Sequence, residues 1–350
     1  GDLENAVAFQ AYRQTLDLYL RLFAHQPDII AIDQHPEYLS TKLGKQLAQT
    51  SEADISLVSI QHHHAHIAAC MAENGIDLNT QPVLGIALDG LGYGEDGTLW
   101  GGEFLLADYR SIQRLACFKP IAMLGGEQAI YQPWRNTYAH LLAAFNWEAL
   151  QTHYGQLELI QFLAQQPRSL LDQLLQKGIH SPLASSAGRL FDAVAAAVGV
   201  CRTQASYEGQ GAIELEALMD ATHLSQVEQD DSAYRFNLVS GFPSILDPSL
   251  MWRTLLNDLR DDVPIPLIAA RFHVGLAAAI VHLVLQLRDH YLFTQVALTG
   301  GVFQNQILTQ QVTQKLHRQG LIVLTHSKVP PNDGGISLGQ ATIAAARSIS

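Results

Sequence analysis

Cysteine, runs of basic residues and long apolar stretches are scarce in this sequence, and each scarcity excludes a class of protein. The three cysteines, Cys70, Cys117 and Cys201, are widely spaced and odd in number, which argues for reduced thiols in a cytoplasmic protein. None has the CxxC spacing of a redox or zinc motif. We therefore expect all three to pack in the core, with a catalytic cysteine as the minor alternative.

The chain has no run of Lys and Arg, and its formal net charge is −12. A protein that binds a nucleic acid backbone by itself usually shows a basic stripe, so the composition disfavours that partner. The most apolar segments, such as 274–285, are too short to span a bilayer, and no membrane association is expected. With 350 residues the chain is long enough for two lobes with separate cores.

A histidine cluster is the most informative feature that is present. Residues 61–66 read QHHHAH and continue into an alanine-rich apolar run, which predicts a helix. In that helix His62 and His66 lie one turn apart on one face, where two imidazoles can share a divalent metal. His63 and His64 point elsewhere around the helix. An exposed, solvated histidine face is the alternative, but the adjacent apolar helix favours the metal.

A third metal ligand must come from a distant part of the chain, and two aspartates are candidates. Asp89 follows a buried-looking strand at 83–88 and opens the glycine-rich stretch 90–94. Asp333 lies in the loop 330–335, which reads PPNDGG. The glycine-rich stretch is expected to be a hairpin turn, and after a strand that ends in Asp it resembles a phosphate cradle. Tight hairpins need glycine in any case, so this motif alone is weak.

Strands at 29–33 and 56–60 alternate with helices, the first of them at 6–25, which implies parallel pairing with chemistry at the carboxyl ends of the strands. Asp33 and His35 follow the first strand and form a candidate surface for substrate or partner. A helix cap with a structural histidine explains these two residues equally well.

The segment 125–265 is predicted to be a mostly helical insertion. Within it, Arg135 stands beside a glycine loop and is a candidate substrate ligand. Asp192 and Glu208 could hold ribose hydroxyls, because carboxylates suit that task. Helix capping and an exposed acid are alternatives of about equal weight.

After a long apolar helix at 268–291, the strand 295–299 leads into Gly300, Gly301 and a further helix. This shape would let a nucleotide base lie on glycine backbone, with Asn305 facing it one turn into the helix.

Together these residues carry a resemblance to a known family. The stretches that match run nearly end to end: 1–5, 33–41, 62–70, 89–94, 125–135, 185–192, 207–210, 300–305 and 331–335. On them the chain resembles the carboxyl-terminal, TsaD-like carbamoyltransferase domain of the HypF family, which acts in NiFe-hydrogenase maturation.

The resemblance implies an α/β fold, the two-lobed actin-like ATPase (ASKHA) fold with a mostly helical insertion. The amino-terminal lobe would comprise 1–80, and the carboxyl-terminal lobe 81–350 with the insertion at about 125–265. Further domains would precede this chain, which we expect to be a fragment whose first lobe lacks its initial strands.

By the same resemblance, His62, His66 and Asp333 are implied metal ligands, with Asp89 close to or on the metal, which would be iron or zinc. Mg²⁺ is a further expected ion if ATP is bound. The candidate nucleotide-binding residues are Gly90, Gly92, Tyr93, Gly94, Asp192, Glu208, Gly209, Gly300, Gly301 and Asn305.

The implied reaction starts from carbamoyl phosphate and ATP. A separate amino-terminal domain makes carbamoyl adenylate, and this type of domain passes the carbamoyl group to the carboxyl-terminal cysteine of HypE, a step toward the cyanide ligands of the hydrogenase. One alternative is transfer to a small-molecule hydroxyl or to tRNA, although the HHHAH form differs from the HxEGH form associated with TsaD. Another is a nucleotide- and metal-binding module without catalysis, and a sugar or acetate kinase of the same superfamily fits less well.

Overall fold

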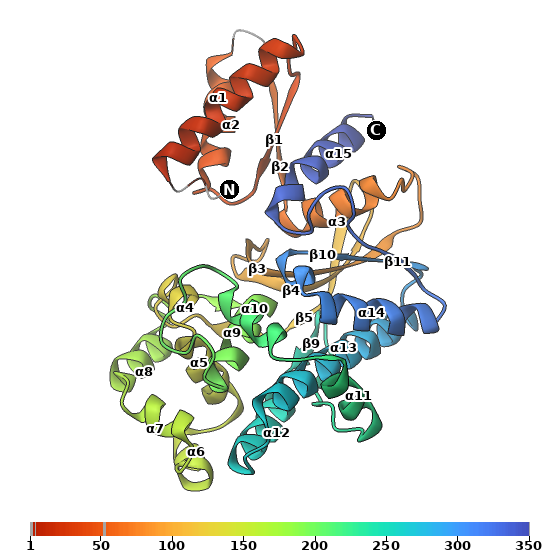
Figure 1. Cartoon of the computed structure of the whole chain (residues 1–350). Coiled ribbons are helices and arrows are strands. Elements are labelled where there is room, and N and C mark those ends of the chain that lie inside the picture. Colours follow the sequence, from red (N-terminus) through yellow and green to blue (C-terminus); the bar gives the residue numbers. More distant parts are fainter. Residues whose placement is uncertain (1–2, 4, 52–53, 350) are drawn as a thin grey trace.

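The computed structural model describes residues 3, 5–51 and 54–349 and contains two sheets surrounded by helices (Figure 1). Part of the matching stretch 1–5 therefore lies outside the described residues. The strands are β1 (Ile29–Asp33), β2 (Ser56–Ile60), β3 (Val83–Tyr93), β4 (Leu99–Ala107), β5 (Ile112–Phe118), β6 (Ile121–Ala122), β7 (Leu183–Ala184), β8 (Asn237–Val239), β9 (Ser244–Asp247), β10 (Gln295–Thr299) and β11 (Ile322–Leu324).

The helices include those predicted at 6–25 and at the histidine cluster. They are α1 (Ala6–Leu22), α2 (Leu39–Thr50), α3 (His62–Glu73), α4 (Gln128–Tyr131), α5 (Trp134–Ala144), α6 (Trp147–Tyr154), α7 (Glu158–Ala164), α8 (Arg168–Lys177), α9 (Ala187–Ala197), α10 (Gln210–Ala217), α11 (Ala221–Gln229), α12 (Ser249–Arg260), α13 (Ile265–Arg288), α14 (Gln306–Arg318) and α15 (Ile336–Ser348). Two 3₁₀ turns, η1 (Gly301–Gln304) and η2 (Asp333–Gly335), precede α14 and α15.

The small sheet consists of β1 and β2, which pair in parallel from Ile29 opposite Ser56 to Asp33 opposite Ile60. This confirms the predicted parallel pairing. Helices α2 and α15 contact both strands and lie on either side of them in the view of Figure 1. The carboxyl ends of β1 and β2 are thereby brought to the start of α3, which directly follows β2.

The large sheet has the order β11-β10-β3-β4-β5-β9-β8. β10 runs parallel to β3 and β11, whereas β3, β4 and β5 form an antiparallel meander. Alternate residues of β3 face opposite ways: Leu84 and Ile86 join the core that contains α9 and α13, and Val83 joins the core that contains α3. The sheet is therefore covered on both faces, and α3 lies across one of them.

The glycine-rich stretch after Asp89 is not the hairpin turn that the sequence predicted. β3 continues through it to Tyr93, with a register shift between Leu88 and Gly92, and the turn itself lies between Gly94 and Thr98. The glycines permit close packing along an irregular strand, as described below. Strand β5 was also missed from the sequence.

The insertion is mostly helical as predicted, but it returns to the sheet. Helix α6 ends at its C-cap residue Gly155 before α7 begins, and β9 pairs in parallel with β5. The boundaries proposed for two lobes and an insertion remain a prediction.

α13 has the predicted length, but it begins at Ile265 and ends at Arg288, three residues earlier than predicted at each end. Its 24 residues include an 18-residue window apolar enough to cross a membrane, and 78% of that window is buried inside the fold. It is the one such helix among the described residues, and it packs at the centre of the larger core. We therefore interpret it as a core helix.

Candidate active site

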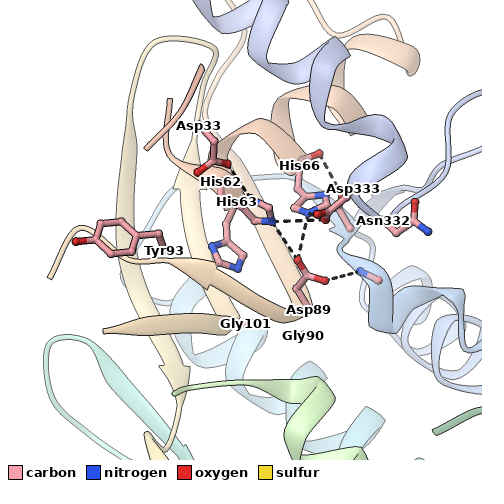
Figure 2. Close-up of polar contacts among 12 residues, drawn as sticks. Asp33, His62, His63, His66, Asp89, Gly90, Tyr93, Gly101, Asn332 and Asp333 are labelled. Atoms are coloured by element: carbon pink, nitrogen blue, oxygen red, sulfur yellow. Dashed lines mark hydrogen bonds and ion pairs between the residues drawn. The ribbon is translucent and has the colours of Figure 1, made fainter. Parts of the chain in front are cut away.

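The histidine motif forms the first two turns of α3. Gln61 is the N-cap residue, and its side-chain oxygen accepts a hydrogen bond from the backbone N–H of His64 at 2.8 Å. His62 and His66 are almost fully buried, each with 1% of its surface exposed. As the helical spacing predicts, both imidazoles point to the same side, toward Asp89 of β3 (Figure 2).

Two carboxylates meet these imidazoles. Asp89 Oδ2 lies 3.4 Å from His62 Nε2 and 3.2 Å from His66 Nε2. Asp333 Oδ1, from the η2 turn at the far end of the chain, lies 3.6 Å and 3.4 Å from the same two nitrogens. The four ligand atoms all lie within 4.8 Å of one another. The predicted candidates thus converge on one point, as the dashed lines of Figure 2 show.

The spacing fits a bound ion. A tetrahedral ion with bonds of about 2.0–2.2 Å separates its ligand atoms by about 3.3–3.6 Å, the tetrahedral edge being about 1.6 times the bond. The four histidine-to-carboxylate distances, 3.2 to 3.6 Å, match this edge. In addition, His62 Nε2 and His66 Nε2 are buried without a hydrogen-bond partner. A divalent cation would satisfy both nitrogens and both carboxylates.

Asp33 completes the site in a way that the sequence did not reveal. Its Oδ2 lies 2.9 Å from His62 Nδ1, and its Oδ1 accepts the backbone N–H of His35 at 2.7 Å. Because Nδ1 of His62 donates to this carboxylate, the lone pair of the neutral ring is on Nε2, the atom that faces the cluster. The strand-end surface predicted at Asp33 and His35 therefore supports a histidine; the only signal was the place of Asp33 at the end of β1.

The carboxylates around His62 and His66 favour a positive charge between them. Burial lowers the pKa of His62, but the carboxylates of Asp33, Asp333 and Asp89 outweigh it and raise that pKa well above its usual value. Asp333 and Asp89 likewise outweigh burial and raise the pKa of His66. Burial opposes ionisation of Asp89, yet the two histidines hold its pKa well below the usual range. Positive charge is thus favoured between the carboxylates, as protons or as a metal.

The loop after β10 holds Asp89 in place. The backbone N–H of Gly301 donates to Asp89 Oδ1 at 3.1 Å, and the N–H of Gly300 donates to Pro331 O at 2.9 Å. Gly300 has φ +94°, and a Cβ there would collide with the carbonyl of Leu88. This loop therefore ties β3 to the segment that carries Asp333.

The glycines of β3 make room for neighbouring side chains. A Cβ on Gly92 would lie 2.5 Å from His63 Cε1 and 2.8 Å from His62 Cδ2, and a Cβ on Gly94 would collide with the indole of Trp100. Gly90 faces the carboxylate of Glu208. The ring of Tyr93 packs edge-on against His35, with the ring centroids 5.4 Å apart. The stretch is thus a close-packing surface beside the metal cluster.

Two of the predicted ribose-side residues lie together near Gly90. Arg189 Nη2 pairs with Glu208 Oε1 at 2.9 Å, and Arg189 Nε lies 3.2 Å from Asp192 Oδ2. Asp192 is buried, and this burial raises its pKa to about 6 despite the guanidinium. Gly209 starts α10 with φ +81°. Asp192 and Glu208, the acidic pair, therefore lie beside Gly90 in the glycine-rich part of β3, the glycine strand.

Two other candidates are engaged in local structure. Asn305 is the N-cap of α14, not a residue one turn into it; its side chain accepts from Leu308 N at 2.8 Å and lies 2.9 Å from His273 Nε2. The guanidinium of Arg135 binds Gln132 Oε1 at 2.6 Å and Leu124 O at 3.3 Å. Neither side chain contacts the histidine cluster among the described residues.

Comparison with known proteins identifies the family. The family model described as "Carbamoyltransferase, Kae1-like Domain, second subdomain" matches 85–340, and "HypF Kae1-like domain" matches 1–73. Carbamoyltransferase HypF of Rhodobacter capsulatus is 39% identical over 351 residues, which cover 99% of this chain but 43% of that protein. A HypF homolog of Cupriavidus necator is 36% identical over 347 residues, which cover 99% of this chain and 84% of the relative.

Solved structures agree with these relatives. The crystal structure of full-length HypF in the phosphate- and nucleotide-bound form superposes with a TM-score of 0.87 at 35% identity, covering all of this chain and 51% of that one. That of T. kodakarensis HypF gives 0.84 at 29% identity and 44% coverage of that chain. The fold is therefore the Kae1-like, ASKHA-type fold that the sequence resemblance implied. The chain spans less than half the length of the Rhodobacter relative, and it belongs to the HypF carbamoyltransferase family.

Proposed function

We propose that this chain carries the carbamoyl-transfer centre of a HypF-type protein, transferring the carbamoyl group of carbamoyl adenylate to the carboxyl-terminal cysteine of HypE. The observation that carries the proposal is the convergence of His62, His66, Asp89 and Asp333 from three distant segments. Membership of the HypF family supplies the reaction class, and the nucleotide in the solved HypF structure supports an adenylate ligand. The cytoplasm is the proposed compartment.

The proposed metal ligands are His62 Nε2, His66 Nε2, Asp89 Oδ2 and Asp333 Oδ1. Two imidazoles and two carboxylates suit Zn²⁺ or Fe²⁺. When bound, such an ion acts as a Lewis acid toward a carbamoyl or phosphate oxygen. We expect Mg²⁺ in addition if ATP itself is bound.

The adenylate is proposed to lie along the glycine strand of β3, between the metal cluster and the acidic pair. Asp192 and Glu208 suit ribose hydroxyls, and the backbone of Gly90 lies beside the Glu208 carboxylate. The proposed nucleotide-binding residues are Gly90, Gly92, Tyr93, Gly94, Asp192, Glu208, Gly209, Gly300 and Gly301. The proposal does not depend on Asn305 or Arg135, because their side chains are engaged locally.

The nucleophile is proposed to come from the partner. In the transfer, a bond forms between the acceptor sulfur and the carbamoyl carbon, the bond from that carbon to the phosphate oxygen breaks, and AMP and the thiol proton leave. Burial raises the pKa of Cys117 to about 12 and that of Cys201 to about 11, and it also raises that of Cys70. No cysteine of this chain is therefore poised as a thiolate at neutral pH.

A transfer assay tests the proposal. The purified chain would be given synthetic carbamoyl adenylate and a peptide with the carboxyl-terminal sequence of HypE, with tRNA and an aminoglycoside as competing acceptors. We expect the peptide thiol to be carbamoylated, and we expect His62→Ala and His66→Ala to lose bound metal and transfer together. His25→Ala, an exposed histidine in the same lobe, is the control. Transfer by a metal-free variant, or transfer only to tRNA or sugar, would contradict the proposal.

A further inference from the structure

The four proposed ligands differ in how firmly the fold holds them. The side chains of His62 and His66 are 1% exposed and that of Asp89 is 10% exposed, whereas that of Asp333 is 67% exposed. Asp333 lies on a short 3₁₀ turn that follows the non-helical segment from Thr325 to Asn332. The geometry of the fourth ligand therefore depends on what anchors this segment.

The carboxylate of Glu73, the last residue of α3, is one anchor. Its Oε2 accepts hydrogen bonds from three consecutive backbone N–H groups, those of Ser327, Lys328 and Val329, at 3.1, 2.7 and 3.3 Å. Its side chain is 2% exposed. Helix α3 supplies both histidines from its first turns. Through Glu73 in its last turn, the same helix also binds the segment that carries Asp333.

His326 is the second anchor and connects back to the histidines. Its Nδ1 lies 2.5 Å from Glu73 Oε1, and its Nε2 lies 2.8 Å from Thr299 Oγ1. The hydroxyl of Thr299 donates its single proton to the carbonyl of His66 at 3.2 Å, so Nε2 of His326 must be the donor to Thr299. A chain of polar contacts therefore runs from the loop through Glu73, His326 and Thr299 to His66.

Cys70, Glu73 and His326 could instead be a second metal site, since their ligand atoms are close enough. The distances argue against it. A common ion would hold Glu73 Oε1 and His326 Nδ1 about 3.3 Å apart at tetrahedral bond lengths, but they are 2.5 Å apart, closer than two ligands of one ion would lie. The other oxygen of Glu73 already accepts from three N–H groups.

We propose that Glu73 and His326 are positioning residues that lock the Asp333 segment onto α3 and so set the geometry of the metal centre. The inference rests on the proposed function, because it presupposes a metal at His62, His66, Asp89 and Asp333. Neither residue contacts the metal or the substrate. Both act through the backbone of the ligand-bearing segments, by the three N–H bonds and by the link to the His66 carbonyl.

The test uses Co²⁺, whose visible absorption reports the geometry of its ligands. Purified wild-type chain, Glu73→Gln and His326→Ala would be titrated with Co²⁺, and their stability measured by urea unfolding. We expect the dissociation constant to rise about 10- to 100-fold in both variants, as for other groups that orient ligands, and the absorption band to change shape. His326→Gln keeps an N–H that can reach Thr299 and should recover part of the affinity.

A matched control separates positioning from general destabilisation. His140→Ala removes another buried histidine, on α5, away from the cluster. It should lose stability but keep the wild-type affinity and spectrum. Wild-type affinity and spectrum in Glu73→Gln and His326→Ala would overturn the inference while leaving the metal centre intact.

Two further results have distinct meanings. If His66→Ala binds Co²⁺ as the wild type does, there is no metal at the proposed centre. That result would contradict both the proposed metal-dependent function and the positioning role of Glu73 and His326. If a second Co²⁺ binds the wild type and is lost only in Glu73→Gln and His326→Ala, these residues are metal ligands, and their positioning role is wrong.

Discussion

The side chains of Asp33 and His62 join the end of the small sheet to the start of the histidine helix, with 2.9 Å between Asp33 Oδ2 and His62 Nδ1. Both side chains are buried, at 5% and 1% exposure. This contact sets which nitrogen of His62 carries the proton and which can bind a metal. It would also make metal binding at the proposed centre depend on a residue of the small sheet.

Asp33→Asn should therefore weaken metal binding without unfolding the chain. The amide cannot stabilise the donor tautomer of His62 as the carboxylate does, and such changes cost about 10- to 100-fold in metal affinity. The measurement is a zinc dissociation constant obtained by competition with a chelating dye. Asp17→Asn, on the exposed face of α1, is the control and should bind zinc normally. Equal affinities for the two variants would show that the contact has no role in binding.

Gly92→Ala should disturb the site by steric conflict. Its Cβ would lie 2.5 Å from His63 and 2.8 Å from His62, and overpacking of this kind costs about 1–3 kcal/mol in the free energy of unfolding. We expect lower stability together with weaker zinc binding, measured by urea unfolding and zinc titration. Gly97→Ala, in the same hairpin at φ +75° with open space around it, should lose about 1 kcal/mol and bind zinc normally. Normal zinc binding by Gly92→Ala would show that His62 tolerates the added methyl group.

Metal should stabilise the folded chain, because the cluster that binds it is assembled only on folding. At a free zinc concentration 100 times the dissociation constant, the free energy of unfolding should rise by about 2.7 kcal/mol. Urea unfolding with and without zinc measures this difference, and a chelator should reverse it. His66→Ala should show no zinc-dependent gain; a gain equal to that of the wild type would place the stabilising ion elsewhere.

Acid should destabilise the chain partly through His140. Burial, together with the charge of Lys119, lowers the pKa of His140 to about 3. Between pH 6.5 and 3 the unfolded chain binds a proton at this residue and the folded chain does not, so its contribution to stability is present above pH 6.5 and is lost as pH falls. The loss is about 1.4 kcal/mol per pH unit.

The difference between wild type and His140→Phe isolates this effect from the other titrating groups. Urea unfolding at several pH values from 6.5 to 5 should give a shallower pH dependence for the variant. Parallel pH dependences would show that His140 is protonated in the folded protein.

Local patterns in the sequence predicted the histidine helix and the strands β1 and β2 correctly, because each depends on spacing within a few residues. The convergence of His62 and His66 follows from one turn of helix. Asp89 and Asp333 could be chosen as candidates because both stand beside glycines, Asp89 after an apolar run and Asp333 in the PPNDGG loop. Their closeness could not be calculated from spacing, since it depends on how β3 and β10 pair in the sheet.

Contacts between distant segments account for the errors. The glycines after Asp89 were interpreted as a turn, whereas Gly92 and Gly94 are needed because α3 and Trp100 pack against the strand. The partnership of Asp33 with His62 joins residues 29 positions apart. That of Glu73 with His326 joins residues 253 positions apart, which no local periodicity in the sequence could indicate.

Anomalous scattering at the zinc absorption edge, from crystals of the chain grown with zinc and an adenine nucleotide, tests the central claim most directly. We predict a peak within about 2.0–2.2 Å of His62 Nε2, His66 Nε2, Asp89 Oδ2 and Asp333 Oδ1, with the nucleotide beside the glycine strand of β3. A zinc-bound crystal without a peak at this cluster, or with His62 and His66 turned away from the zinc, would contradict the account.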